Sequence, residues 1–462
     1  MFTKKYLNST IDTCKKVLFA ILLFYFFLQK GVKRSVSKRS EFIEKVTAIL
    51  DEYQGEDSSV YLFSADYADF KMINHAYGFA QGDVLLNKTV QSVRQIPECV
   101  LCERAAMDQF IFVVVVGNSR TEAEIVALCD RWFERFLSAE QDSYPACSLK
   151  VWCGIYEIRD RDVSAAVDNA NLARREAKAT GEQTTVLFKE SMLEKLVEQK
   201  KRETEVDQAL KEGRFAFYLQ PQVDLTSGEI VGAEALARGF HPDGQMISPA
   251  VFVPIFEKNG LILDLDYLIL EQVCRHIRER LDAGKPVIQI SINLSRLHLG
   301  KRDTAQRIHE IVERYKTPPE LLMFELTENI LLHEFVSAKT LGSDLHAFGY
   351  KTSVDDFGSG YAGIDVWRNL VFDELKLDRS FLTDDPEMKQ RNEIIVSGIV
   401  GIAQRLNISV ICEGVETKEQ CGSLLEAGCR LAQGFYFSKP LPADDFYTVY
   451  QKLHGRYPMD YK

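Results

Sequence analysis

Oxygen-bearing side chains recur in the second half of the chain, each near the end of a short apolar segment. Carboxylate and amide oxygens, with no histidine or cysteine among them, favour Mg²⁺ or Mn²⁺ over Zn²⁺. Acids gathered in one buried place repel one another, so either several are protonated or divalent cations neutralise them. The set, which also contains one lysine, is Glu234, Asn293, Glu325, Glu328, Asp355, Asp356, Lys376, Glu413 and Gln433.

From about Phe215 onward, short apolar strands alternate with helical stretches. This alternation predicts an α/β fold, a TIM-like βα barrel of about 250 residues. The C-terminal ends of barrel strands converge on one face, so the barrel would bring these side chains into one pocket. A single acid of this kind is more often a helix cap or a surface charge, but recurrence at successive strand ends favours a cation site.

The segment from about Tyr218 to Tyr450 resembles the EAL family of cyclic di-GMP phosphodiesterases, over half of the chain. The departures are Gly239 in place of an aromatic residue, Arg430 in place of an aspartate and Cys412 in place of a small residue. None of them removes an expected metal ligand. The matching motifs are Glu234-Ala235-Leu236 with Arg238, Asn293, Glu325-Leu326-Thr327-Glu328, Asp355-Asp356-Phe357-Gly358-Ser359-Gly360-Tyr361, Lys376, Glu413-Gly414-Val415-Glu416 and Gln433-Gly434-Phe435.

The resemblance implies a two-metal phosphodiesterase that cleaves cyclic di-GMP to linear pGpG, with Glu234, Lys376 and Glu413 as its catalytic residues. Lys376 would position the attacking water, Arg238 and Gln433 would serve substrate binding, and Glu328 would brace the glycine-rich loop that follows Asp356. Two Mg²⁺ or Mn²⁺ ions would polarise the phosphodiester and lower the pKa of that water. The implied metal ligands are Glu234, Asn293, Glu325, Asp355, Asp356 and Glu413.

A smaller α/β domain is expected before the barrel, because strand-like and helix-like segments also alternate from about Ser58. The stretch from Ser58 to Glu190 resembles the GGDEF family of diguanylate cyclases. The matching positions are Asp66, Phe70, Lys71, Asn74, Tyr77, Gly78, Gly82 and Asp83.

This second resemblance fails where cyclase chemistry would occur. The family's Gly-Gly-Asp-Glu-Phe hairpin is Ala106-Met107-Asp108-Gln109-Phe110 here, and a second metal-binding aspartate is replaced by Ala68. Side chains obstruct the close backbone approach that glycines allow, and an amide supplies no negative charge. We therefore expect no cyclase activity. The domain is expected either to bind GTP through Asp66, Asn74 and Asp83 and regulate its neighbour, or to serve as a scaffold.

The remaining segments set the expected boundaries. Residues 1–40 contain an apolar run of twelve residues, Val17–Leu28, flanked by lysines and arginines. The run is too short to span a bilayer comfortably, so we expect it to attach the chain to anionic lipid on the cytoplasmic face of the membrane. A buried helix and a signal peptide are the alternatives. The expected domains are 41–190 and 214–462, joined by a charged helix over 191–213.

Composition limits the classes of function. A net charge of −11 argues against binding to a nucleic acid polymer, which requires a basic face. Ten cysteines without metal-binding spacing fit packed thiols in a reducing cytoplasm. We expect a homodimeric enzyme; the alternatives are a receptor that binds cyclic di-GMP without cleaving it, and a bifunctional cyclase and hydrolase.

Overall fold

The chain divides into two compact units, Met1–Gln199 and Lys200–Lys462, in a computed structural model. No helix within the described ranges is long and apolar enough to cross a membrane. The expected lipid-binding segment, Met107 and Ser359–Tyr361 lie outside those ranges. The structure describes residues 40–53, 57–106, 108–328, 334–358, 367–368, 370–383 and 385–458.

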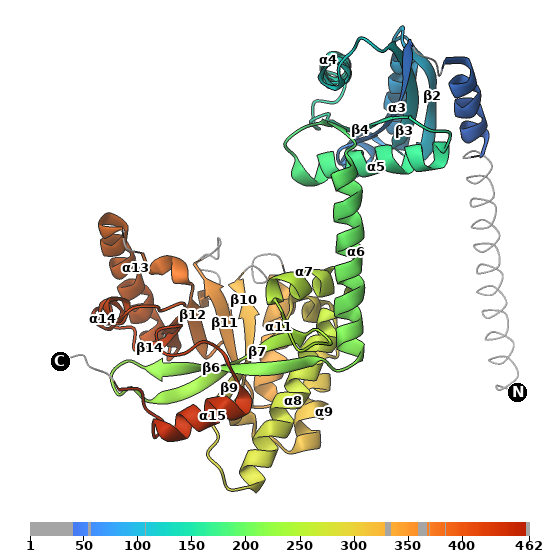
Figure 1. Ribbon diagram of the computed structural model, residues 1–462. Helices are drawn as coiled ribbons and strands as arrows, with labels where there is room; N and C mark the ends of the chain where they lie inside the picture. Colours follow the sequence, from blue (N-terminus) through green and yellow to red (C-terminus); the bar gives the residue numbers. More distant parts are fainter. Residues whose placement is uncertain are drawn as a thin grey trace, which may run out of the picture. The chain divides into compact units, whose positions relative to one another are not determined.

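The first unit is built on a five-stranded sheet in the order β2-β3-β1-β4-β5 (Figure 1). Alternate residues of β3 enter different cores: Phe112 packs with α2, α3 and α4, whereas Val113 packs with a helix over 40–53 and with α5. Helices therefore cover both faces of the sheet. The elements are β1 Ser58–Tyr67, α2 Phe70–Tyr77, α3 Phe79–Val93, β2 Cys99–Ala106, β3 Gln109–Gly117, α4 Glu122–Gln141, β4 Val151–Glu157, α5 Val163–Thr180 and β5 Thr185–Leu187.

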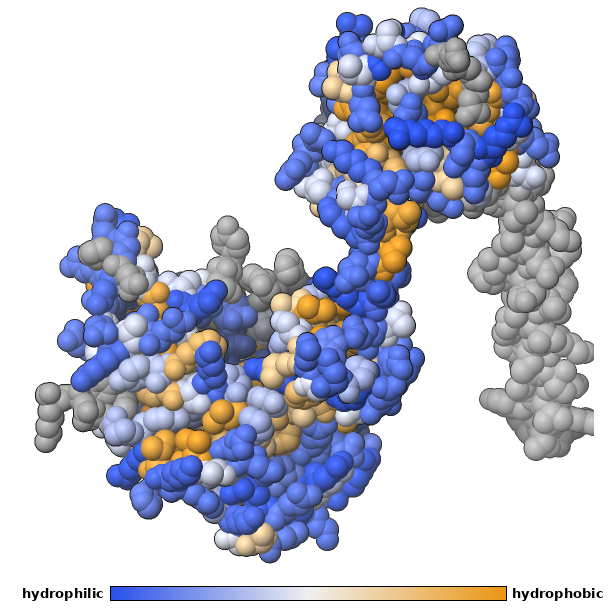
Figure 2. All heavy atoms as spheres, viewed as in Figure 1, coloured by the Kyte–Doolittle hydropathy of each residue, from blue (hydrophilic) through white to orange (hydrophobic). Residues whose placement is uncertain are grey.

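Helix α6 covers Glu190–Lys211, within the stretch that the sequence marks as a charged helix. Its last turns pack on the second unit, where Val206 and Ala209 are buried in the barrel core. Figure 2 shows an apolar strip on the same helix, and the exposed Leu193 and Val197 lie on α6.

The second unit is a βα barrel, which confirms the predicted fold class. Eight strands close into a ring through the pairing of β6 with β7, and the short strands β8 and β15 extend the sheet. The ring strands are β6 Phe215–Asp224, β7 Ile230–Phe240, β9 Gln289–Asn293, β10 Leu322–Thr327, β11 Lys351–Phe357, β12 Glu374–Leu377, β13 Ser409–Cys412 and β14 Leu431–Gln433. The short strands are β8 Met246–Ile247 and β15 Leu441–Pro442.

One barrel strand runs against the others. Strand β6 is antiparallel to both of its ring neighbours, while the other strands of the ring are parallel to one another. A tight turn links β6 to β7: Asp224 Oδ1 accepts hydrogen bonds from the backbone N–H groups of Thr226 and Ser227, and Gly228 has φ 73°. So short a turn can join only antiparallel strands, because a parallel pair needs a crossover of a dozen or more residues.

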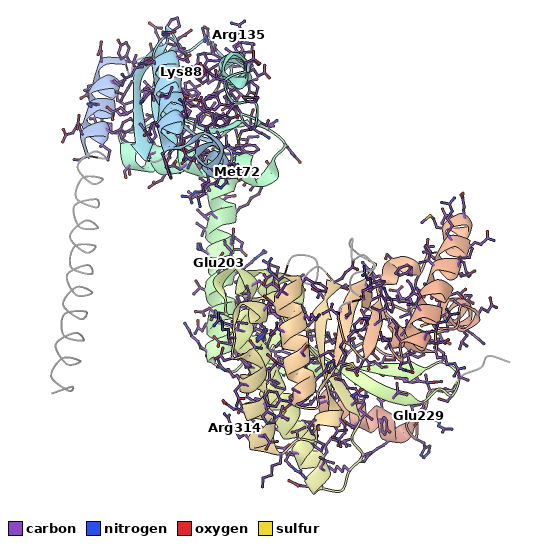
Figure 3. All side chains as sticks on the ribbon, turned by 180° about the vertical axis from the view of Figure 1, so that it is seen from behind. Met72, Lys88, Arg135, Glu203, Glu229 and Arg314 are labelled. Carbon is purple, nitrogen blue, oxygen red and sulfur yellow. The ribbon has the colours of Figure 1, made fainter. Side chains whose placement is uncertain are left out.

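Helices surround the barrel (Figures 1 and 3). In α8, Leu265, Ile269, Val273 and Ile277 follow one another at a spacing of four and are all buried, so this stripe packs on the strands. The helices are α7 Pro249–Asn259, α8 Ile262–Asp282, α9 Thr304–Tyr315, α11 Phe335–Ala347, α13 Pro386–Arg405, α14 Lys418–Glu426 and α15 Ala443–Lys452. Three short 3₁₀ helices are η1 Arg296–Gly300, η2 Pro319–Leu321 and η3 Arg379–Phe381.

Candidate active site

A buried lysine occupies the point where the strand ends converge. Lys376 of β12 is 0% exposed, and its Nζ lies within ion-pair distance of carboxylates on four other barrel strands or at their ends. These carboxylates belong to Glu325 at 2.6 Å, Glu413 at 2.6 Å, Asp355 at 3.2 Å and Glu234 at 3.3 Å. The structure therefore brings together side chains that lie far apart in the sequence.

Strand β11 presents two consecutive acids, Asp355 and Asp356, to this cluster. In a regular strand, consecutive side chains point to opposite faces. Here the register with β12 shifts between Val354 and Phe357, and Asp356 has φ 56°, a left-handed conformation that is strained for a residue other than glycine. As a result Asp355, Asp356 and Glu413 each offer a carboxylate oxygen within 4.8 Å of the other two.

Two amide side chains fix the carboxylate of Glu234. Asn293 Nδ2 donates to its Oε1 at 2.7 Å, and Gln433 Nε2 donates to its Oε2 at 2.5 Å. Gln433 also donates to Gln220 Oε1 at 3.2 Å, while its own Oε1 is buried without a hydrogen-bond partner. Asn293 and Gln433 thus lie at the site as expected, and a direct contact of Gln433 with substrate stays a prediction.

Burial perturbs the acids in opposite directions. It raises the pKa of Glu325 well above its usual value, that of Glu413 to about 8 and that of Asp356 to about 6. Burial acts on Glu234 in the same sense, but the Lys376 ammonium and the two amide hydrogen bonds outweigh it, so its pKa is lowered. The pKa of Lys376 is raised, because four carboxylates outweigh its own burial.

These residues fit divalent cations. The acids Glu234, Glu325, Asp355, Asp356 and Glu413, together with the Lys376 ammonium, carry a formal charge of −4, which two divalent cations would cancel. Buried polar atoms are normally hydrogen-bonded, yet Glu325 Oε1 has no hydrogen-bond partner. An all-oxygen ligand set of this kind matches Mg²⁺ or Mn²⁺.

The loop after β11 is tied to the end of β10. Glu328 is 1% exposed and its Oε2 accepts a hydrogen bond from the backbone N–H of Gly358 at 2.6 Å. Gly358 has φ 99°, and a Cβ at this position would lie 2.3 Å from the ring of Phe381. A glycine is therefore required here, and the loop-bracing role expected of Glu328 agrees with this contact.

Arg238 lies close to the site on β7. Its Nη1 donates to the Ala237 carbonyl oxygen at 2.8 Å, its guanidinium carbon lies 5.7 Å from the centre of the Tyr218 ring, and burial lowers its pKa. A half-buried guanidinium without a carboxylate bonded to it in the described structure suits an anionic ligand. Its contact with a substrate phosphate stays a prediction.

The corresponding position of the first unit does not fit a metal ion. Asp66 Oδ2 is paired with Arg174 Nη1 of α5 at 2.7 Å, and both side chains are largely buried. Gln109, which is opposite Asp66 in the sheet, donates through Nε2 to Asn171 Oδ1 at 2.6 Å and to Ser64 Oγ at 3.1 Å. An internal cation and a neutral hydrogen-bond network thus occupy the place where carboxylates would bind a metal.

The two other residues expected to bind GTP lie together at the junction of α2 and α3. Asn74 Oδ1 is buried without a hydrogen-bond partner and lies 2.1 Å from the position of a Cβ on Gly82, the neighbour of Asp83. The Asp83 carboxylate forms an exposed ion pair with Arg104 at 2.7 Å. The pair Asn74 and Asp83 is therefore separate in its contacts from Asp66, which binds Arg174.

Sequence analysis missed two residues that shape these sites. Gln220 of β6 is opposite Glu234 in the sheet and receives the hydrogen bond from Gln433; a glutamine inside an apolar strand was the available signal. Arg174 gave no signal, because its partner Asp66 lies on a strand far earlier in the chain.

Replacing Asp356 by glycine should stabilise the metal-free chain and weaken cation binding. Glycine relieves the left-handed backbone strain, which costs about 1 kcal/mol, and removes one of the repelling charges. Asp356→Ala is the control, since it removes the same charge and keeps a Cβ. We expect a higher Tm in EDTA for Asp356→Gly than for Asp356→Ala, and weaker Mn²⁺ binding by titration calorimetry for both. An alanine variant as stable as the glycine variant would contradict the strain.

Stabilisation by Mg²⁺ should increase with pH. The folded-state pKa of Glu413 is raised from 4.5 to about 8, so its contribution to stability is fully present below pH 4.5 and is lost as pH rises through about 8. Cations require the deprotonated carboxylate. We expect the increase in Tm on adding Mg²⁺ to be larger at pH 8.5 than at pH 6.0, and Glu413→Gln to reduce the difference. Equal increases at both pH values would contradict this assignment.

The comparisons with known proteins agree with both halves of the structure. The EAL domain family model matches residues 203–440, more than half of the chain, and the model of the diguanylate cyclase GGDEF domain matches residues 35–184. The structure of the EAL enzyme Bd1971 in its cGMP-bound form is similar in fold, with a TM-score of 0.51 and 24% identity, and the match covers 75% of this chain and 82% of that chain.

Two relatives from Pseudomonas aeruginosa are named as cyclic di-GMP phosphodiesterases. NbdA is 29% identical over 422 residues, which cover 90% of this chain and 53% of that protein. RocR is 34% identical over 242 residues, which cover 52% of this chain and 61% of that protein. The chain spans about half the length of the curated relatives that match most of it. The chain therefore belongs to the EAL domain family, and a GGDEF domain precedes its EAL domain.

Proposed function

We propose that the EAL domain, with bounds near 214–462, hydrolyses cyclic di-GMP to linear pGpG. The observation that carries this proposal is the buried Lys376 among four carboxylates at the strand ends, a cluster with too much negative charge for one ammonium. The homology to named cyclic di-GMP phosphodiesterases supports the choice of substrate.

The chain's own residues divide the work. When bound, two Mg²⁺ or Mn²⁺ ions supply the positive charge that polarises the phosphodiester and acidifies the attacking water. Lys376 stays protonated at neutral pH, because its pKa is raised, and donates hydrogen bonds to that water. Arg238 places its planar fork on a phosphate. The ligands would be Glu234, Asn293, Glu325, Asp355, Asp356 and Glu413.

The reaction consumes one water and breaks one bond. Water adds to one phosphorus atom, the P–O3′ bond breaks, and the departing 3′ oxygen takes up a proton. The product is a linear dinucleotide with a 5′-phosphate. Glu234 is held by Asn293 and Gln433, and Glu328 holds the loop at Gly358, so the site's geometry is largely set before substrate arrives.

Glu234→Ala should abolish hydrolysis by the full chain. Removing a carboxylate that would hold cations should cost more than the roughly 10–100-fold typical of outer-shell partners, so we expect a loss of at least about 100-fold. The measurement is chromatographic detection of pGpG from cyclic di-GMP with Mg²⁺ or Mn²⁺. Glu229→Ala is the matched control, because this exposed acid precedes β7 at the opposite end of the strand (Figure 3). Tight binding of cyclic di-GMP by the wild-type chain without product would instead identify a receptor.

We propose that the GGDEF domain has lost cyclase activity and regulates the EAL domain by binding GTP at Asn74 and Asp83. The unpartnered oxygen of Asn74 supports a ligand at the junction of α2 and α3. The pairing of Asp66 with Arg174 and the hydrogen bonds of Gln109 argue against a catalytic metal.

GTP at millimolar concentration should change the rate of cyclic di-GMP hydrolysis by the full chain, and Asn74→Ala should remove the change. Asn87→Ala on the exposed side of α3 is the control and should respond as the wild type does. No cyclic di-GMP should form from GTP. A rate that GTP leaves unaltered would show that the domain is a scaffold.

A further inference from the structure

The turn after β9 decides where Asn293 points. Asn293 is the last residue of β9, and the chain passes directly into η1, Arg296–Gly300. Within the described structure its side chain makes one hydrogen bond, from Nδ2 to Glu234 Oε1. An amide nitrogen cannot ligate a cation, so this bond leaves the amide oxygen as the atom for metal binding. A single hydrogen bond fixes a side chain weakly, so its placement depends on the backbone that carries it.

A carboxylate from another helix holds that backbone. Asp266 of α8 accepts two hydrogen bonds on Oδ2, one from the Ser295 backbone N–H at 3.0 Å and one from His298 Nε2 at 3.0 Å. The Asp266 side chain is 11% exposed and His298 is fully buried. Hydrogen bonds to a charged group are roughly twice as strong as neutral ones, and a low-dielectric surrounding strengthens them further.

The turn is held from both sides. On the barrel side, the Leu294 backbone N–H donates to the Glu325 carbonyl oxygen at 3.0 Å. On the helix side, Asp266 binds the next N–H along the chain, that of Ser295. The Thr304 hydroxyl then donates to the His298 carbonyl oxygen at 2.9 Å, which secures the far end of the turn.

We infer that Asp266 is a positioning residue for cation binding, acting through the turn 294–298 on the amide of Asn293. The inference rests on the proposed function, because it concerns the same metal site. Without Asp266, the Ser295 N–H and the His298 Nε2 lose their acceptor inside the fold, and the turn must move to find water. Metal geometry tolerates only small displacements of a ligand, so such a shift weakens cation binding.

A double-mutant cycle in the full chain tests this inference. We expect Asp266→Ala and Asn293→Ala each to weaken Mn²⁺ binding by about tenfold or more, the range for residues that orient a metal ligand. If Asp266 acts through Asn293, Asp266→Ala has no further effect once Asn293 is alanine. Mn²⁺ affinity is measured by titration calorimetry, and Tm in EDTA reports on stability.

Glu271→Ala is the matched control. Glu271 is also an acid of α8, and it accepts hydrogen bonds from Tyr315 at 2.8 Å and Arg314 at 3.1 Å, away from the turn after β9 (Figure 3). We expect it to lower Tm and to leave Mn²⁺ affinity unchanged. If Asp266→Ala does not fold, Asp266→Asn takes its place, because the amide oxygen keeps one acceptor and should give a smaller loss of affinity.

The outcomes are separable. Absence of Mn²⁺ binding by the wild-type chain would refute the proposed function, and the inference with it. Wild-type binding that Asp266→Ala leaves intact would overturn the inference alone, as would losses that add in the double variant. Hydrogen exchange over residues 289–300 gives a metal-free check, because Asp266→Ala should accelerate it and Glu271→Ala should not.

Discussion

The ammonium of Lys376 and the carboxylates around it form the interaction on which the barrel and its site both depend. Burial of a lysine is costly unless it is paired, and here Glu234, Glu325, Asp355 and Glu413 supply its partners. Each partner comes from a different strand, so the same contacts that neutralise Lys376 also join the strand ends. A change in any one of these acids therefore alters both the charge balance and the shape of the pocket.

The site is an unfavourable arrangement that the surrounding fold maintains. Asp356 has a strained backbone, Glu325 and Glu413 have raised pKa values, and buried acceptors such as Glu325 Oε1 lack hydrogen-bond partners. Strain and unsatisfied groups cluster at functional sites, where they persist because neighbouring structure determines them. In this barrel the bulge of β11, the brace from Glu328 to Gly358 and the amides on Glu234 supply that determination.

The sequence predicted the barrel and the residues at its strand ends, because alternating strands and helices imply parallel strands whose ends meet. It could not predict features that depend on pairing between distant segments. The antiparallel direction of β6, the register shift that turns Asp356, and the contact of Asp266 with Ser295 all arise from tertiary packing. The lipid-binding role of Val17–Leu28 stays a prediction.

The two units solve one electrostatic problem in different ways. In the GGDEF domain the Asp66 carboxylate is neutralised by Arg174 from the same chain, and Gln109 is neutral. Little negative charge is left there to attract an external cation. In the EAL domain the acids exceed Lys376 by four charges, and no arginine or histidine of the described structure is ion-paired with them. A buried excess of this size must be protonated or bind cations, and the raised pKa of Glu413 shows that protons and cations compete for the same oxygens. That competition makes cation occupancy of the EAL domain depend on pH, whereas the internal ion pair of the GGDEF domain leaves nothing to titrate in the same range.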